Sequence, residues 1–331
     1  MISSRQQKYS NPAMAVIVGL RDMFTTKTVC GTLKEGDRLD GKTVFVDGSS
    51  SGLGFAIAVG VARRGANVIM ACRSGIPGKG EEVKRLSGNP NIHMIPVDLS
   101  DFNAISRLVS QISDPSSLIP HPDIFILNAG IVPSKARQTP QGLEEMFMVN
   151  YFSKFVFIRL LLQQGILGIP NSVSRVIFVT SESHRNPEAI NWEGFGEYRE
   201  YGIKKSMELY GYYKLLLVTF ARELSRRLNP GNTINTAVFA MCPGPVNSNI
   251  AREAPSFFQP LLKIIFGLFF KSPQKAAIPV VYLTASEDMK GKPFDYLFLM
   301  SRQEIDEKAA DPMNGRKLWE LSDALLDKIH P

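Results

Sequence analysis

The feature that most constrains this chain of 331 residues is a short apolar run that enters a serine and glycine turn and leaves it as an apolar helix. Residues 43–47 form the β-branched run, and residues 55–62 carry apolar side chains at helical spacing. Glycines let the backbone approach a pyrophosphate, and the N-terminus of a helix offers it free N–H groups and a positive dipole end. The turn has the spacing G-x-x-x-G-x-G, and it predicts a dinucleotide site at Gly48, Ser50, Ser51, Gly52, Leu53 and Gly54.

Strand-like runs recur along the chain, with segments of helix length between them. They lie at 43–47, 67–71, 92–97, 123–127, 174–180 and 234–241, with a seventh expected at Tyr296–Met300. This alternation predicts an α/β fold with a Rossmann-type, doubly wound parallel sheet of about seven strands. Hydrophobic residues make up 44% of the chain, enough for a sizeable core, and no linker divides it. We expect an N-terminal extension at 1–40 and a single domain at 41–331.

The end of the second predicted strand indicates which dinucleotide is bound. A dinucleotide fold places an acidic side chain there to bind the ribose 2′-OH of NAD, or an arginine nearby to accept the 2′-phosphate of NADP. This chain has Arg73 at that place, and no acidic residue follows until Glu81. We therefore expect NADP in preference to NAD.

Tyr210 and Lys214 are four residues apart in a segment with helical spacing, so they share one face of a helix. A free tyrosine has a pKa near 10, but a nearby cation favours the phenolate and brings proton transfer within range. The pair alone is weak evidence, because such spacing arises by chance in many helices. Its weight comes from the motifs that precede it.

Further motifs follow one another between Gly41 and Ser248. They are Val97-Asp98-Leu99, Asn128-Ala129-Gly130, Asn150, Ser181, and the turn Pro243-Gly244 with Val246 and Ser248 behind it. With the glycine-rich turn and the Tyr210–Lys214 pair, this ordered set resembles the short-chain dehydrogenase/reductase family. The resemblance implies hydride transfer between a nicotinamide cofactor and a carbonyl or alcohol carbon.

The same resemblance implies a role for each motif residue. Tyr210 would exchange a proton with the substrate oxygen, Lys214 would lower the pKa of Tyr210 and bind the nicotinamide ribose, and Ser181 would polarise the carbonyl. Asn150 would hold a water of the proton relay. The remaining residues would bind the cofactor, namely Asp98 and Leu99 at the adenine, Asn128, Ala129 and Gly130 beside the turn, and Pro243, Gly244, Val246 and Ser248 at the nicotinamide.

Some positions depart from the family's usual motifs. Asp47 stands where a threonine is usual, and a longer insert at 186–209 follows Ser181, where we expect it to line the substrate mouth. Ser183 is a second candidate hydroxyl, and we expect His184 in a loop near that mouth rather than as a metal ligand.

Within the family, the chain is most similar to the retinol-dehydrogenase-like branch. Ala71-Cys72-Arg73, the run 181–184 and the run 315–322 carry this similarity, which implies a lipophilic alcohol, aldehyde or ketone such as a retinoid, steroid or fatty carbonyl. Protochlorophyllide reductases share part of it but usually have a cysteine after the catalytic lysine, and this chain has Leu215-Leu216-Leu217 there. A catalytically weak nucleotide-binding scaffold or sensor stays open as the alternative.

The net charge and the number of cysteines limit the kinds of binding partner and metal site that the chain can have. The net charge is +7, but basic residues are mixed with acidic ones and no nucleic-acid reader motif is present, so nucleic acid is a poor candidate. Three scattered cysteines and four histidines without ligand spacing predict no disulfide framework and no metal site. We expect Cys72 and Cys242 to be buried, and the protein to reside in a reducing compartment.

Two apolar stretches leave the relation to membranes open. Residues 13–20 are too short to span a bilayer and lack a convincing signal-peptide cleavage site. Residues 257–271 lie in the segment 251–275, where we expect a substrate lid. They fit a packed lid or homodimer contact, a peripheral membrane contact that admits a dissolved substrate, or a loop without a membrane role. The predicted location is the cytoplasm or the cytosolic face of a membrane.

Overall fold

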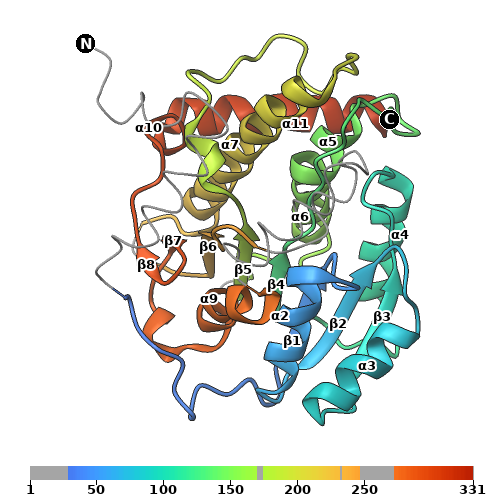
Figure 1. The fold of residues 1–331 in the computed structure, drawn as a ribbon, viewed down its shortest axis with the longest axis vertical. Helices are drawn as coiled ribbons and strands as arrows, with labels where there is room; N and C mark the ends of the chain where they lie inside the picture. Colours follow the sequence, from blue (N-terminus) through green and yellow to red (C-terminus); the bar gives the residue numbers. More distant parts are fainter. Residues whose placement is uncertain (1–28, 170–173, 232, 247–271, 331) are drawn as a thin grey trace.

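One mostly parallel sheet runs through the middle of the protein in the computed structural model, which describes residues 29–169, 174–231, 233–246 and 272–330 (Figure 1). Every neighbouring pair of strands is parallel except β7 and β8. The order across the sheet is β3 (Ile92–Pro96), β2 (Asn67–Cys72), β1 (Thr43–Asp47), β4 (Ile124–Leu127), β5 (Ser174–Val179), β6 (Thr236–Cys242), β7 (Phe294–Phe298) and β8 (Ser301–Arg302).

The predicted doubly wound sheet is confirmed. Each of the seven predicted strands overlaps an observed parallel strand, with ends that differ by at most two residues. The sequence does not predict β8, because two residues are too few to show a period.

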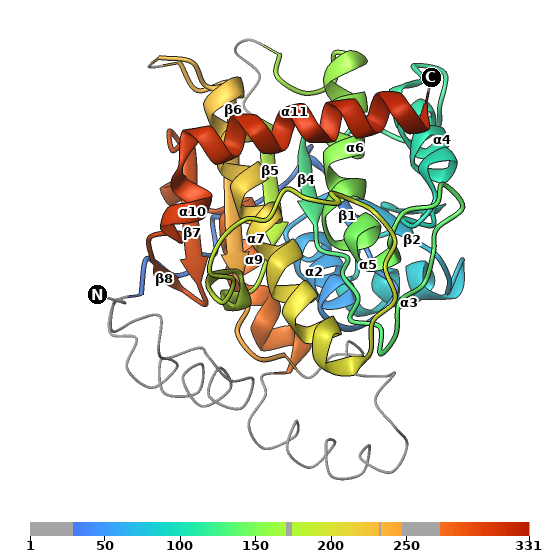
Figure 2. The same cartoon turned by 90° about the horizontal axis from the view of Figure 1, so that it is seen from above.

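Helices cover both faces of the sheet (Figures 1 and 2). One face carries α2 (Gly52–Ala62), α3 (Gly78–Ser87) and α9 (Pro273–Ala285). The other carries α4 (Phe102–Ser113), α6 (Ser153–Gln163), α7 (Ile203–Leu228) and α11 (Pro312–Ile329). Short helical turns complete the described residues, namely α5 (Glu145–Phe147), the π-helical turn η2 (Met148–Phe152), the 3₁₀ turns η3 (Glu182–Arg185) and η6 (Glu287–Met289), and α10 (Glu307–Ala310).

Strand side chains alternate between two hydrophobic cores because successive residues of a strand point to opposite faces. Phe45 on β1 packs with α4, α6, α7 and α11, whereas Val44 and Val46 pack with α2 and α9. In the second core α2 packs closely on α9, and a Cβ added at Gly60 would lie only 2.7 Å from Val281 Cγ2. Burial on both faces explains why the strands are apolar throughout.

The direction of strand order reverses between β1 and β4, which are neighbours. Ligands of such open α/β sheets bind outside the carboxyl ends of the strands at this reversal. The glycine-rich turn follows β1 there, and Asn128 follows β4, so the fold places the predicted cofactor motifs side by side.

Parts of the predicted extension and lid lie outside the described residues, including 1–28 and 247–271 and thus both apolar stretches. Of the extension, Cys30 donates from its N–H to the carbonyl of Met300, and Leu39 is buried in the α2–α9 core. Of the lid, Ser272 and the start of α9 are described. Among the described helices, none combines the length and hydropathy needed to cross a bilayer.

Candidate active site

The turn after β1 has the shape that the sequence predicts for a phosphate cradle. Gly48 and Gly52 have φ of 61° and 56°, a region that residues with a side chain rarely adopt. A Cβ on Gly54 would lie 2.4 Å from the carbonyl oxygen of Gly48, so only glycine fits. Ser51 precedes α2 but does not cap it with its side chain, which leaves N–H groups of the first turn for an anion.

Asp47 joins this turn to the end of β4. Its buried carboxylate accepts hydrogen bonds from the backbone N–H groups of Asn128 at 2.5 Å and of Ala129 at 2.6 Å. Asn128 in turn donates from Nδ2 to the carbonyl of Asp47 at 3.1 Å. The departure from the usual threonine therefore leaves the turn firmly attached to Asn128-Ala129-Gly130.

Gly130 lies where the predicted catalytic residues of two helices meet. A Cβ built on it would be 3.4 Å from Asn150 Oδ1 and 3.6 Å from Lys214 Nζ. Asn150 is fully buried in the π-helical turn, where it accepts from the N–H of Ile131 at 2.7 Å and donates to its carbonyl at 2.9 Å. The side chain of Asn150 thus fixes the loop that follows β4.

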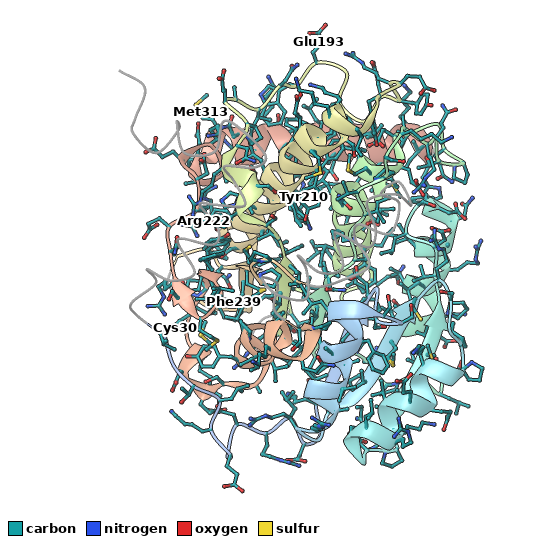
Figure 3. All side chains as sticks on the ribbon, in the orientation of Figure 1. Cys30, Glu193, Tyr210, Arg222, Phe239 and Met313 are labelled. Carbon is teal, nitrogen blue, oxygen red and sulfur yellow. The ribbon has the colours of Figure 1, made fainter. Side chains whose placement is uncertain are left out.

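Tyr210 and Lys214 share one face of α7, and Figure 3 labels Tyr210 near the centre of the view. Burial raises the pKa of Tyr210 above its ordinary value, the Cys242 thiol raises it further, and the Ser181 side chain opposes the shift. The net shift is upward because desolvation of the phenolate dominates, and the lowering of this pKa by Lys214 stays a prediction. The Tyr210 phenol is protonated at neutral pH.

Lys214 is itself buried, and its ammonium donates to the carbonyl of Val179 at 3.0 Å. Desolvation lowers the pKa of Lys214 to about 7, and the positive charge of Lys154 lowers it further. Ser181 follows β5 and accepts a hydrogen bond from the N–H of Ser183. The geometry brings Ser181, Tyr210, Lys214 and Asn150 to the carboxyl edge of the sheet.

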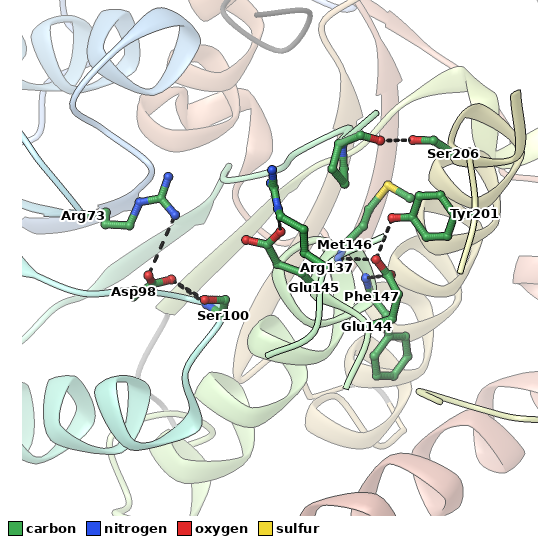
Figure 4. Close-up of polar contacts among 11 residues, drawn as sticks. Arg73, Asp98, Ser100, Arg137, Glu144, Glu145, Met146, Phe147, Tyr201 and Ser206 are labelled. Atoms are coloured by element: carbon green, nitrogen blue, oxygen red, sulfur yellow. Dashed lines mark hydrogen bonds and ion pairs between the residues drawn. The ribbon is translucent and has the colours of Figure 1, made fainter. Parts of the chain in front are cut away.

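Arg73 stands at the end of β2, with 57% of its side chain exposed. Its guanidinium lies 3.8 Å from the carboxylate of Asp98, which also accepts bonds from Ser100, as Figure 4 shows. Leu99 packs partly against the core. An exposed, loosely paired arginine is free to bind a phosphate by a bidentate contact.

The turn after β6 also has a glycine in the left-handed region. Gly244 has φ of 70°, and its N–H donates to the Cys242 sulfur at 3.4 Å. Pro243 is buried, and Val246 is half-buried against the α2–α9 core. Ser248 lies outside the described residues, so its predicted role stays a prediction.

The insert after Ser181 packs against the loop that follows β4 (Figure 4). Tyr201 donates from its hydroxyl to the buried Glu144 at 2.7 Å, and Ser206 donates to the carbonyl of Pro133 at 2.5 Å. Glu144 also caps α5 by accepting from the N–H groups of Met146 and Phe147. This loop leads into the helix of Asn150, so the insert supports the site from one side.

The sequence predicts His184 in a loop near the substrate mouth, but the structure places it in the interior. It is fully buried in η3, its Nδ1 lies 2.8 Å from the carbonyl of Ser181, and the Tyr296 ring packs on it at 5.3 Å. Since a carbonyl can only accept, Nδ1 carries the proton. The Ser183 hydroxyl is buried without a hydrogen-bond partner in the described structure, which leaves Ser181 as the capping hydroxyl.

The buried cysteines agree with the sequence prediction, whereas one buried lysine beside the site was not predicted. Cys72 and Cys242 are buried thiols as expected, and the described part of the chain holds no cluster of metal-ligating side chains. Lys154 was missed, although it follows Asn150 by four residues and therefore shares its helix face.

The chain is similar to known proteins. Residues 42–192 match the family model described as short chain dehydrogenase. Retinol dehydrogenase 14 of Mus musculus is 30% identical over 302 residues, covering 87% of this chain and 86% of that protein. Retinol dehydrogenase 13 of Homo sapiens is 30% identical over 328 residues, covering 95% and 93%.

Solved structures share the fold. A crystal structure of an uncharacterized protein from Mycobacterium paratuberculosis is 26% identical with a TM-score of 0.66, and the match covers 88% of this chain and 95% of that one. The NADP complex of Pseudomonas aeruginosa RhlG is 22% identical with a TM-score of 0.58, covering 81% and 98%. The second likeness shows the fold alone.

Proposed function

The chain belongs to the short-chain dehydrogenase family and is an NAD(P)-dependent oxidoreductase of CH–OH groups, and we propose that it uses NADPH to reduce a lipophilic aldehyde or ketone. The observation that carries the proposal is the approach of Lys214 and Asn150 to Gly130, beside Tyr210 and Ser181. A nucleotide-binding scaffold has no need of all four side chains.

The residues fit a nicotinamide dinucleotide, because Gly48 and Gly54 have no room for a side chain and the start of α2 has no side-chain cap. When bound, such a cofactor supplies the hydride. Ser181 would donate a hydrogen bond to the substrate oxygen as negative charge develops there. Lys214 and Asn150 would hold the cofactor ribose and the relay beside the phenol.

Tyr210 supports the reducing direction. A reduction needs a proton donor at the oxygen that becomes an alcohol, and the raised pKa of Tyr210 keeps its phenol protonated at neutral pH. The choice of NADP rests on Arg73, whose exposed guanidinium stands where the 2′-phosphate is expected. The substrate class rests on the relatives, which are named retinol dehydrogenases, and we extend it to steroid and fatty carbonyls.

The test is a cofactor-oxidation screen of the purified protein. NADPH and NADH are each supplied with retinal, a steroid ketone and an aliphatic aldehyde, and the alcohol product is quantified. We expect stoichiometric alcohol formation with NADPH and a slower rate with NADH. Tight NADPH binding without turnover on any carbonyl would favour the scaffold, and an equal or better rate with NADH would refute the role of Arg73.

A further inference from the structure

Two charged side chains are buried directly behind the candidate active site. Asp47 ends β1 and Lys154 lies in the first turn of α6, and their side chains are 3% and 1% exposed. Asp47 Oδ2 lies 3.6 Å from Lys154 Nζ. Burying two charges is costly unless hydrogen bonds satisfy both groups, so the other contacts of each side chain decide what the pair does.

The second carboxylate oxygen of Asp47 binds the loop that follows β4. Oδ1 accepts the backbone N–H groups of Asn128 and Ala129, which precede Gly130. The carboxylate thus fixes the end of β4 relative to the glycine-rich turn. A lateral shift of Asp47 would move Gly130, which lies against Asn150 and Lys214.

The ammonium of Lys154 also binds the helical segment that carries Asn150. Its ammonium donates to the carbonyl of Val149 at 2.5 Å and lies 3.3 Å from the hydroxyl of Ser153. Val149 belongs to the π-helical turn that carries Asn150. The same carbonyl also accepts from the Ser153 hydroxyl at 3.1 Å, so Lys154 is the second side-chain donor to this turn.

The pair also sets the charge around Lys214. Four titratable groups in the described structure face Lys214, namely Lys154 on α6, Asp47 on β1, Cys242 on β6 and Tyr210 on its own helix. The charge of Lys154 lowers the pKa of Lys214, whereas the Asp47 carboxylate and the Cys242 side chain favour a higher value. Lys154 itself faces Asp47, and burial lowers its pKa while Asp47 raises it.

We propose that Asp47 and Lys154 are positioning residues of the oxidoreductase reaction, which hold Asn128–Gly130 and the Asn150 turn in register and tune the charge at Lys214. The inference rests on the proposed function. It assigns a task to the aspartate that replaces the usual threonine, and it explains why a lysine is buried beside it rather than a neutral residue.

The experiment compares kcat/KM against pH for wild type, Asp47→Asn, Lys154→Met and the double variant. Removing the cation raises the pKa of nearby acids, so Lys154→Met is expected to shift the profile upward by about one pH unit. Removing the anion in Asp47→Asn is expected to shift it downward, and the charge-neutral double variant should return close to wild type. Shifts of both single variants in the same direction, or no shift in either, would overturn the proposal.

A solvent-exposed control pair lies at the opposite end of β1, about 13 Å away along the strand. Asp123 accepts the N–H of Thr43 at 2.8 Å and pairs with Lys42 at 2.9 Å, but the side chains of Lys42 and Asp123 are 52% and 34% exposed. Lys42→Met and Asp123→Asn should leave the pH profile where it is. A control shift equal to that of the buried pair would show a general charge effect and would also refute the assignment.

A second readout separates this inference from the proposed function. NADPH fluorescence gives the dissociation constant of NADPH across pH 6 to 10. Protonation of Lys214 is expected to affect this constant as it affects catalysis, so the variants should shift both pH profiles in the same way. If wild type turns over no carbonyl, the proposed function fails, and opposite shifts in NADPH binding still support the pair. If Lys154→Met does not fold, Asp47→Asn decides, because an asparagine oxygen can still accept the two backbone bonds.

Discussion

The ammonium of Lys214 lies 5.7 Å from the centroid of the Tyr210 ring, one helical turn along α7. It donates to the carbonyl of Val179 rather than to solvent. A lysine held this way is poorly solvated, and its pKa falls to about 7 from an ordinary 10.5. The charge of Lys214 is therefore sensitive to pH in the range where the protein is expected to work.

This shift predicts a pH-dependent stability of the cofactor-free protein. Between about pH 7 and 10.5 the unfolded chain binds a proton at Lys214 that the folded chain does not, so the free energy of unfolding rises with pH through this window. Lys214→Met lacks this dependence. The stability of the variant relative to wild type should be greatest below pH 7 and should decline towards pH 10.5.

Thermal unfolding at half-unit pH steps measures this difference. Lys205→Met is the control, because Lys205 lies on the same helix with 61% of its side chain exposed. Its offset from wild type should stay constant. A constant offset for Lys214→Met as well would contradict the buried, shifted lysine.

His184 predicts a loss of folding stability at acidic pH. Burial lowers its pKa to about 4 from 6.5, and the charge of Arg185 lowers it further. The unfolded chain binds the extra proton between these values, so stability is lost as pH falls from 6.5 to 4, by up to about 1.4 kcal/mol per pH unit. In His184→Gln this loss should disappear, and urea unfolding at pH 4.5, 5.5 and 7 checks it. Parallel stability curves for the two proteins would refute it.

Arg73→Ala tests the cofactor preference. Losing a charged contact to the 2′-phosphate should lower kcat/KM for NADPH by about 10- to 100-fold. The value for NADH should change little, because NADH has no phosphate there. Arg85→Ala on α3 serves as the control, since Arg85 is exposed and lies in the last turn of that helix. A uniform loss with both cofactors would indicate damage to the fold instead.

Gly54→Ala tests the close contact in the glycine-rich turn. The new Cβ would lie 2.4 Å from the Gly48 carbonyl oxygen and 2.6 Å from Asn128 Nδ2, so the turn must open. We expect a loss of about 1–3 kcal/mol in unfolding free energy together with a large loss of NADPH affinity. Gly78→Ala, where nothing lies within 4 Å of the added Cβ, should unfold like wild type. Normal cofactor affinity in Gly54→Ala would refute the phosphate cradle.

The sheet could be predicted because each central strand is apolar on both faces and is followed by a readable turn. Residues 43–47, for example, match β1 at both ends. The motif residues at the carboxyl edge follow from the same logic, since parallel strands bring their ends together.

Contacts between distant segments could not be predicted. Asp47 is recognisable as a departure from the usual threonine, but nothing near it in the sequence points to Lys154, whose burial depends on how α6 packs. His184 looks like a loop residue because its neighbours are polar, and it is buried because Tyr296 on β7 covers it. The pKa of Tyr210 follows from the depth of the site, which a helical spacing does not contain.

The proton donor is the central claim, and Tyr210→Phe in the NADPH-dependent reduction of retinal tests it most directly. Phenylalanine keeps the ring and removes only the hydroxyl, so we expect kcat to fall by about 10²- to 10⁴-fold. The dissociation constant of NADPH, read by fluorescence on the same preparation, should stay within about twofold of wild type. A variant that binds NADPH and reduces retinal at the wild-type rate would contradict the account.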